Sequence, residues 1–367
     1  MSSALAVTGT LAALGTEILN DEAFGASPQG ERLARCQNSP NWRNGAFCNR
    51  EPTENLRANR AGFLDLARFL LESDQGQKPS QPIPAVKTNL RALAEDTLVW
   101  FGHSSFLLRS GGLHILIDPT FRNAFPFAIP GLSTPFAPFP GSNLYSDQDL
   151  PNIDWLVITH DHYDHLDEKT VKAIVNRVDH VVMPLGVGAH LERWGYPPRK
   201  LVELDWFETQ HLSPSARITC LPAQHFSGRF LKRNETLWCG FMFEICNRHI
   251  YLSGDGGYGS HFREIARRWP RIDLALLEAG QYNSAWSGIH LMPQDWTQAL
   301  IDLHPRCVMP THNSRYDLSR HPWTEPLNHA LASTTTLGID IALPLIGSCL
   351  NLNRPDAYAQ QWWPKTP

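Results

Sequence analysis

The chain has 367 residues, of which 42% are apolar and 19% charged, a composition typical of a globular protein with one or two domains. Its formal net charge of −4 argues against a nucleic-acid partner, because such partners require a basic surface. No run of about 20 apolar residues predicts a transmembrane helix, and residues 4–14 lack the basic region of a secretory signal. We therefore expect a cytoplasmic protein.

Residues 1–95 are predicted to form an N-terminal extension that is largely helical. Thr53 is a candidate N-cap for a helix that continues to Leu71 and carries its apolar residues on one face. That face must pack on the main body or on a second subunit, so a homodimer is one expectation. A proline-rich link at residues 78–84 leads to the main body.

From residue 96 onward, apolar strand signals alternate with helical patterns such as residues 260–269 and 293–303. This alternation predicts an α/β fold, an αββα sandwich of two mixed sheets packed face to face with helices on the outer faces. We assign residues 96–350 to this domain and residues 351–367 to a C-terminal tail.

The seven cysteines are dispersed, and none lies in a candidate ligand motif. We expect reduced thiols, with a Cys36–Cys48 disulfide as the alternative. Cys220, Cys246 and Cys307 lie in apolar runs and are predicted to be small buried residues.

Residues 121–141 form an insertion with five phenylalanines and five prolines. Prolines at this density disfavour a helix or a central strand. A large exposed aromatic area usually marks an interaction surface. Phe125, Phe127 and Phe136 are therefore candidates for the wall of an apolar channel; alternatively, the loop buries its rings against its own domain.

Residues 160–165 place three imidazoles and a carboxylate in the pattern H-x-H-x-D-H. The preceding residues 154–158 are predicted to form a buried strand, and Asp167 to cap a helix that ends near Asn176. Neutral imidazole nitrogen and carboxylate oxygen are ligands of zinc, at about 2.0–2.2 Å. In an extended segment His160 and His162 point to the same side and can bind one ion.

Asp164 and His165 lie beyond that pair and can reach a second ion. Two metals about 3.5–4 Å apart form a hydrolytic centre. The alternative is a surface loop that is merely rich in histidine and aspartate.

Further candidate ligands follow apolar strands later in the chain: His225, Asp255 and His312. Each is weak alone, because a histidine at a strand end is more often a satisfied polar residue and Asp255 lies in a glycine turn. The order of the set favours a shared metal centre.

That order resembles the metallo-β-lactamase fold superfamily. Seven further motifs are similar to the family of N-acyl-phosphatidylethanolamine-hydrolysing phospholipases D: WFGHSS at residues 100–105, IDP at 117–119, VELDW at 202–206, PAQH at 222–225, SGDGGY at 253–258, IHLMPQD at 289–295 and WTEP at 323–326. The resemblance covers roughly residues 98–330.

This resemblance implies two zinc ions, with iron or manganese as alternatives. His160, His162 and His225 would bind one ion, Asp164, His165 and His312 the other, and Asp255 would bridge them. It also implies hydrolysis of an N-acylated phospholipid by a hydroxide shared between the metals. The aromatic content of residues 121–141 suits contact with the acyl chains of such a substrate or with a membrane surface.

Other residues receive candidate roles near the metals. Asp164 is expected to orient the nucleophile, and His290 to line the substrate cavity or protonate a leaving group. Asp118 is expected to orient a ligand imidazole, whereas His103 either does the same, contacts a phosphate, or is a core-edge histidine.

Three further residues are candidates for the substrate pocket: Tyr258, Gln281 and Tyr282. The segment around Gln281 and Tyr282 departs from the family pattern near the expected substrate pocket and not at the candidate ligands.

The remaining histidines, His190 among them, have no motif support and are interpreted as surface or satisfied core residues. Two alternative functions stay open. One is a lactonase or β-lactamase-like hydrolase of a small ester or amide, and the other is a non-catalytic metal-binding scaffold.

Overall fold

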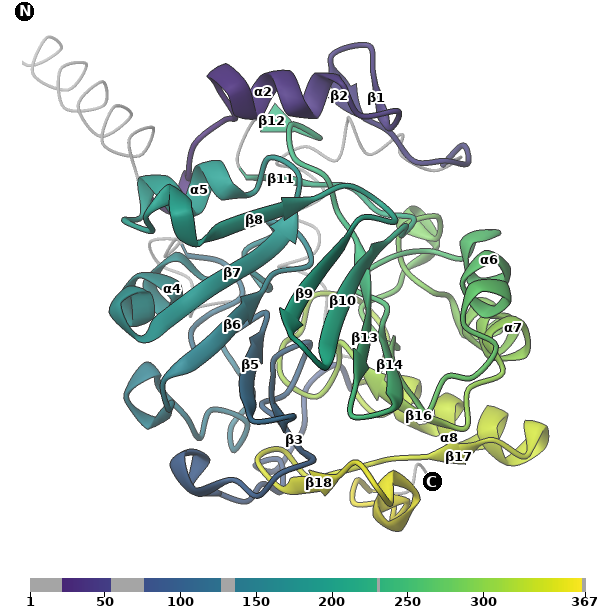
Figure 1. Ribbon diagram of the computed structural model, residues 1–367. Coiled ribbons are helices and arrows are strands. Elements are labelled where there is room, and N and C mark those ends of the chain that lie inside the picture. Colours follow the sequence, from purple (N-terminus) through teal and green to yellow (C-terminus); the bar gives the residue numbers. More distant parts are fainter. Residues whose placement is uncertain (1–21, 54–75, 127–135, 230–231, 365–367) are drawn as a thin grey trace, which may run out of the picture.

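The computed structural model describes residues 22–53, 76–126, 136–229 and 232–364 (Figure 1). The helix predicted from Thr53 to Leu71 and the side chain of Phe127 lie outside these residues. Within the described part of the chain, no helix has the length and apolar composition that a membrane span needs.

The first of two seven-stranded sheets has the order β18-β3-β4-β5-β6-β7-β8. Neighbouring strands are antiparallel from β18 to β5 and parallel from β5 to β8. Its strands are β3 (Thr97–Trp100), β4 (Phe106–Ser110), β5 (Leu113–Ile117), β6 (Ile153–Val157), β7 (Val178–Pro184), β8 (Leu201–Leu204) and β18 (Cys349–Asn351).

The second sheet has the order β17-β16-β15-β14-β13-β10-β9. It is antiparallel from β9 to β14 and parallel from β14 to β17. Its strands are β9 (Thr209–Ser213), β10 (Ala216–Leu221), β13 (Gly240–Ile245), β14 (Arg248–Leu252), β15 (Leu274–Glu278), β16 (Cys307–Thr311) and β17 (Asp340–Ile341).

Helices cover the outer face of each sheet (Figure 1). Those on the first sheet are α4 (Glu168–Ile174) and α5 (Gly188–Arg193), and those on the second are α6 (His261–Arg268), α7 (Pro293–Leu303) and α8 (Glu325–Leu337). The predicted αββα sandwich is confirmed. Helix α7 has the predicted limits, and Asp167 caps α4 by accepting a hydrogen bond from the Lys169 amide.

Outside these layers, the N-terminal part contributes α2 (Gly30–Gln37) and a hairpin of β1 (Trp42–Arg43) and β2 (Ala46–Phe47). A second small hairpin joins β11 (Gly228–Arg229) to β12 (Lys232–Arg233). The 3₁₀ helices are η1 (Glu22–Phe24), η3 (Leu90–Ala92), η4 (Asp147–Asp149), η5 (Val175–Arg177), η6 (Pro198–Lys200), η7 (Ser284–Trp286) and η8 (Pro355–Tyr358).

Strands such as β3 and β15 are buried along their whole length and are almost entirely apolar, because both of their faces are covered. In β3, Leu98 and Trp100 point into the core between the sheets, whereas Val99 points to the helices. In β13, Phe243 points into the same inter-sheet core and Met242 to the helices of the second sheet. Because successive side chains of a strand point to opposite faces, alternate residues pack into the core between the sheets and into the core between a sheet and its helices.

All seven cysteines are free thiols, as predicted. Cys220 and Cys307 are buried in the inter-sheet core. The predicted burial of Cys246 is wrong. Cys246 is exposed because it lies in the turn between β13 and β14, with a φ of 50°.

The packing predicts that Phe243→Ala strongly destabilises the protein. The Phe243 side chain is fully buried between the sheets, and its removal leaves a cavity that should cost about 3–5 kcal/mol of unfolding free energy. Urea unfolding measures this loss. Ile301→Ala on the surface of α7 is the control, because Ile301 is 50% exposed and should change stability by about 0.5 kcal/mol or less. Equal losses in both variants would contradict the proposed core.

Candidate metal centre

The predicted ligands gather where the ends of strands from both sheets meet. In the first sheet, His103 follows β3, Asp118 follows β5, and residues 159–167, the metal loop, follow β6. In the second sheet, His225, Asp255 and His312 follow β10, β14 and β16. Two backbone hydrogen bonds join the edges: the His312 amide donates to the His103 carbonyl, and the His103 amide donates to the Asn313 carbonyl.

His160, His162 and His225 form the first group of converging side chains. The Nδ1 atom of His162 lies 2.9 Å from His160 Nε2 and 3.2 Å from His225 Nε2. Nitrogens bound to one tetrahedral zinc at 2.0–2.1 Å lie about 3.3 Å apart, so this spacing fits a shared ion. Burial lowers the pKa of all three imidazoles, which favours the neutral form that binds metals.

The backbone selects which nitrogen of His225 faces this group. Its Nδ1 atom lies 2.8 Å from the carbonyl oxygen of Ile289 and donates a hydrogen bond to it. Nε2 is then the unprotonated nitrogen, with its lone pair directed to the shared site. A partner on the far nitrogen commonly orients metal-binding histidines in this way.

Asp164, His165 and His312 form the second predicted group, and His103 lies with them. His103 Nε2 is 2.9 Å from Asp164 Oδ2, and its ring centroid is 4.0 Å from that of His312. Burial opposes ionisation of Asp164, but the neighbouring His165 and His103 outweigh it and lower its pKa. His103 thus contacts a candidate ligand directly, whereas the sequence left its place open.

Asp255 lies between the two groups. Its Oδ2 atom is 3.1 Å from His165 Nε2 and 3.8 Å from His160 Nε2, while Oδ1 is 3.1 Å from His312 Nδ1. Burial opposes its ionisation, but His165 and His312 outweigh burial and lower the pKa of this carboxyl well below its usual range. A buried carboxylate in this place can bridge two cations.

The donor set fits a pair of divalent cations. His165 Nε2 and Asp255 Oδ1 are buried, yet neither forms a well-directed hydrogen bond within the described residues. Each unsatisfied buried polar atom costs about 1–3 kcal/mol. A cation would satisfy both atoms, and imidazole with carboxylate is a donor set suited to zinc or iron.

The ligands are held by further contacts behind them. Asp118 accepts a hydrogen bond from His165 Nδ1 at 2.8 Å and is also bonded by the amide and hydroxyl of Thr159. Asp118, His103 and His312 have positive φ angles of 40°, 54° and 63°. Left-handed backbone is unfavourable for such residues and often occurs at functional sites.

Glu278 is part of this cluster, although the sequence analysis did not identify it. It ends β15, and its Oε1 atom lies 2.6 Å from His290 Nδ1. Burial disfavours the charged form of His290, but Glu278 outweighs burial and raises its pKa. In the sequence, Glu278 could have been found only as the single carboxylate that ends the otherwise apolar strand Leu274–Glu278.

His290 itself lies beside both groups of ligands. Its ring centroid is 5.1 Å from that of His225 and 5.3 Å from that of His312. Because Glu278 holds Nδ1, Nε2 is the ring nitrogen left for other contacts.

Three predicted pocket residues use their polar atoms in contacts within the protein. Tyr258 donates to Asp302 of α7, and Tyr282 donates to Glu325 at the start of α8. The Gln281 amide group donates to the Tyr316 carbonyl and accepts from the Leu318 amide. A role in substrate binding stays a prediction for these residues.

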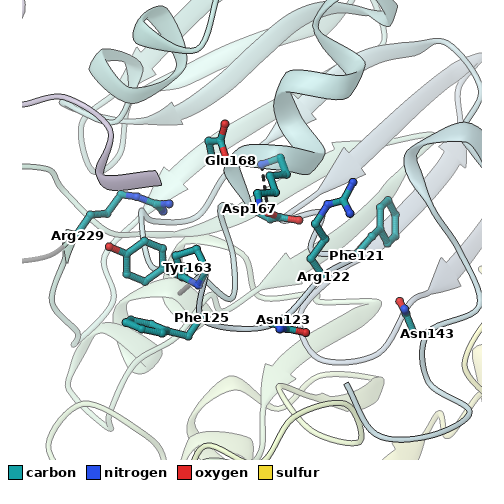
Figure 2. A pocket seen from close by; sticks show the side chains of 11 residues that line it. Phe121, Arg122, Asn123, Phe125, Asn143, Tyr163, Asp167, Glu168 and Arg229 are labelled. Carbon is teal, nitrogen blue, oxygen red and sulfur yellow. Dashed lines mark hydrogen bonds between the residues drawn. The ribbon is translucent and has the colours of Figure 1, made fainter. Parts of the chain in front are cut away.

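A cavity of about 330 Å³ adjoins the outer side of the metal loop (Figure 2). Tyr163 and Asp167 of that loop line it, but none of the candidate ligands does. Figure 2 shows Tyr163 beside Phe125, with ring centroids 5.4 Å apart. The lining also carries both signs of charge, because Arg122, Lys169 and Arg229 are cationic and Asp167 and Glu168 are acidic. The cavity can therefore offer apolar, polar and charged contacts to a ligand.

The described part of the insertion at residues 121–141 packs its phenylalanine rings against the protein itself, and a channel wall for acyl chains stays a prediction. Phe121 and Phe139 are buried in the cores. Phe125 and Phe136 are half-buried and contact each other, with centroids 5.8 Å apart.

Comparison with known proteins supports the assignment of the histidine and aspartate cluster to a metallo-β-lactamase-like metal centre. A family model described as "Beta-lactamase superfamily domain" matches residues 114–313. The chain is 36% identical over 366 residues to an uncharacterized protein of Mycobacterium tuberculosis, covering 98% of this chain and 93% of the relative. It is 30% identical over 213 residues to N-acyl-phosphatidylethanolamine-hydrolyzing phospholipase D 1 of Caenorhabditis elegans, covering 53% of this chain and 57% of that protein.

A solved structure shares the fold at lower identity. CmlA, a diiron β-hydroxylase from Streptomyces venezuelae, aligns with a TM-score of 0.52 and 20% identity, over 71% of this chain and 55% of that one. The fold, the histidine and aspartate cluster and the sequence matches together define a metal-dependent hydrolase. The chain belongs to the metallo-β-lactamase superfamily and is related to the N-acyl-phosphatidylethanolamine-hydrolysing phospholipases D.

We predict that His162→Ala and Asp255→Ala each remove bound metal and lower hydrolysis by more than about 100-fold. The loss should exceed the 10–100-fold effect of outer partners, because these side chains are themselves candidate ligands. Elemental analysis gives the metal content, circular dichroism the fold, and an ester assay the activity. His211→Ala, an exposed histidine outside the cluster, is the control. Full metal content and activity in either ligand variant would refute the assignment.

Proposed function

We propose that the protein is a phosphodiesterase of the phospholipase D type, acting on N-acyl-phosphatidylethanolamine-like lipids. The observation that carries this proposal is the two-group cluster around Asp255 in a chain 30% identical to a C. elegans phospholipase of that specificity. The match spans only 53% of this chain and 57% of the relative. The substrate is therefore part of the proposal.

We assign two divalent ions to the cluster, zinc by its ligand preference, with iron or manganese as alternatives. When bound, such ions stabilise charge on phosphate oxygen and lower the pKa of water toward about 7. His160, His162 and His225 would hold one ion, and Asp164, His165 and His312 the other. Asp255 would contact both. Asp118 would keep the His165 ring in place through its Nδ1 hydrogen bond.

His290 is the residue to which we assign the leaving-group proton. Hydrolysis forms a bond between water oxygen and phosphorus and breaks the bond from phosphorus to the N-acylethanolamine oxygen. The departing alkoxide then requires a proton. His290 lies beside the ligand rings, and Glu278 stabilises its protonated form, which can donate from Nε2.

The lining of the cavity beside the metal loop supports an amphiphilic substrate. Phe125 and Tyr163 offer apolar surface to a lipid tail. The reacting phosphodiester would lie at the candidate ligands, none of which lines this cavity. The composition of residues 121–141, with five phenylalanines and five prolines, leads us to propose peripheral contact with a membrane through this insertion.

A substrate panel tests the proposed function. Purified protein, supplied with zinc or manganese, is assayed on N-acyl-phosphatidylethanolamine, on a simple phosphodiester and on lactones. We expect phosphatidic acid and N-acylethanolamine from the lipid. In isotopically labelled water, the label should enter phosphatidic acid, because the bond to phosphorus is the one that breaks. His162→Ala run in parallel excludes a contaminating enzyme.

Two results would overturn the proposal in favour of named alternatives. Turnover of lactones alone would identify a carbonyl-directed hydrolase. No turnover of any substrate by protein that holds its metal would identify a non-catalytic metal-binding scaffold.

We further predict that Phe125→Ser with Phe136→Ser lowers activity on long-chain lipids more than on short-chain ones. Each methylene that loses its contact costs about 0.8 kcal/mol, or roughly fourfold in kcat/KM. A series of acyl-chain lengths measures the effect. Phe207→Ser is the control, because this half-buried ring packs beneath Arg268 rather than beside the metal loop. Equal losses at all lengths would exclude an acyl-chain wall.

A further inference from the structure

Residues 22–28, the N-terminal segment, lie beside α5 and lead into α2 (Figure 1). This segment precedes the region that the family model matches, which begins at residue 114. It nevertheless contacts the metal loop through two routes, one by way of Asp161 and His190 and the other by way of Arg229. The candidate metal centre lies on the other side of the same loop.

The first route starts from Asp161, between the two histidines of the H-x-H motif. In an extended segment Asp161 points away from the side to which its neighbours His160 and His162 point. Its buried carboxylate accepts hydrogen bonds from the Gly228 amide at 2.7 Å and the Thr236 hydroxyl at 2.9 Å. Fixing Asp161 therefore fixes the direction in which both candidate ligands face.

His190 connects Asp161 to the N-terminal segment. Its Nδ1 atom accepts a hydrogen bond from the Ala26 amide at 2.9 Å. Nε2 is therefore the protonated nitrogen, and it lies 3.2 Å from Asp161 Oδ2. The Ala26 amide thus selects the His190 tautomer that can donate to Asp161. The side chains of His190 and Asp161 are both buried.

Arg229 makes the second route. Its Nε atom donates to the Ala23 carbonyl at 2.7 Å, and its Nη1 atom donates to the Asp161 and Leu166 carbonyls at 2.6 and 2.9 Å. The guanidinium is nine-tenths buried and stacks over the Tyr163 ring. One side chain therefore ties the N-terminal segment to both ends of the ligand-bearing part of the loop.

Gly25 shows how closely the segment fits. Its φ is 69°, and a Cβ atom placed on it would lie 2.0 Å from His190 Nδ1. Any larger residue must displace either the segment or His190. The contact with His190 consequently depends on this glycine.

We propose that the N-terminal segment positions the metal loop, through the Asp161–His190–Ala26 hydrogen bonds and through Arg229, and thereby sets the affinity for metal. Asp161, His190 and Arg229 are positioning residues in this scheme, because none belongs to the candidate ligand set. The inference rests on the metal centre of the proposed function but not on its substrate.

Gly25→Ala tests this inference, with Gly30→Ala as its matched control. Both glycines have positive φ, 69° and 54°, but a Cβ at Gly30 meets nothing within 4 Å. Both variants therefore carry backbone strain, and only Gly25→Ala disturbs His190. Competition with a chelator should show metal affinity lowered about tenfold or more in Gly25→Ala, within the range for outer partners, and unchanged in Gly30→Ala.

Urea unfolding of the metal-free proteins separates positioning from general stability. We expect Gly25→Ala to unfold at a lower urea midpoint than Gly30→Ala, because only its Cβ overlaps His190, but to be fully folded without urea, where metal affinity is measured. Metal binding by Gly25→Ala as tight as by Gly30→Ala would overturn the inference, whereas absence of metal from the parent chain would instead overturn the proposed function.

If Gly25→Ala does not fold, two His190 variants test whether the N-terminal segment positions the metal loop. Gln places an amide nitrogen near the position of Nε2, so His190→Gln keeps the contact with Asp161 and loses that with Ala26. Asn places an oxygen near Nδ1, so His190→Asn keeps the contact with Ala26 and loses that with Asp161. Each should weaken metal binding about tenfold, and unchanged affinity in both would refute the proposed positioning.

Discussion

The buried carboxylate of Asp255 is the group around which this edge of the molecule is built. It lies 3.1 Å from His165, which follows the first sheet, and 3.1 Å from His312, which follows the second. Buried imidazoles at this density are unfavourable unless their ring nitrogens have partners. The carboxylate supplies one such partner, and the cations that we propose would supply the others. The packing of the two sheets and the chemistry of the site therefore depend on the same contacts.

The fold alone does not determine the reaction. CmlA has a similar fold, and its description is that of a diiron β-hydroxylase rather than a hydrolase. What distinguishes one member from another is the set of side chains around the metals. Here that set includes the Glu278–His290 pair. The proposed assignment of a phosphodiester substrate depends on this pair and on the candidate ligands rather than on the fold.

The metal loop is held from two sides. Its histidines converge on the candidate ion positions, while Asp161 and the backbone of the same loop bond His190 and Arg229 on the opposite side. Because alternate residues of an extended segment point in opposite directions, the two sets of contacts do not compete. A segment outside the matched family domain thereby becomes part of the support for the metal centre.

The sequence by itself determined the sandwich fold and the limits of α7, because helical and strand periodicity are local properties. It also grouped His160 with His162, since their spacing is local. Glu278 and Asp161 were missed because a lone carboxylate acquires its role only from distant partners, His290 in one case and His190 in the other. Only the tertiary structure decided these contacts, since they join residues far apart in the chain through side-chain directions that spacing cannot give.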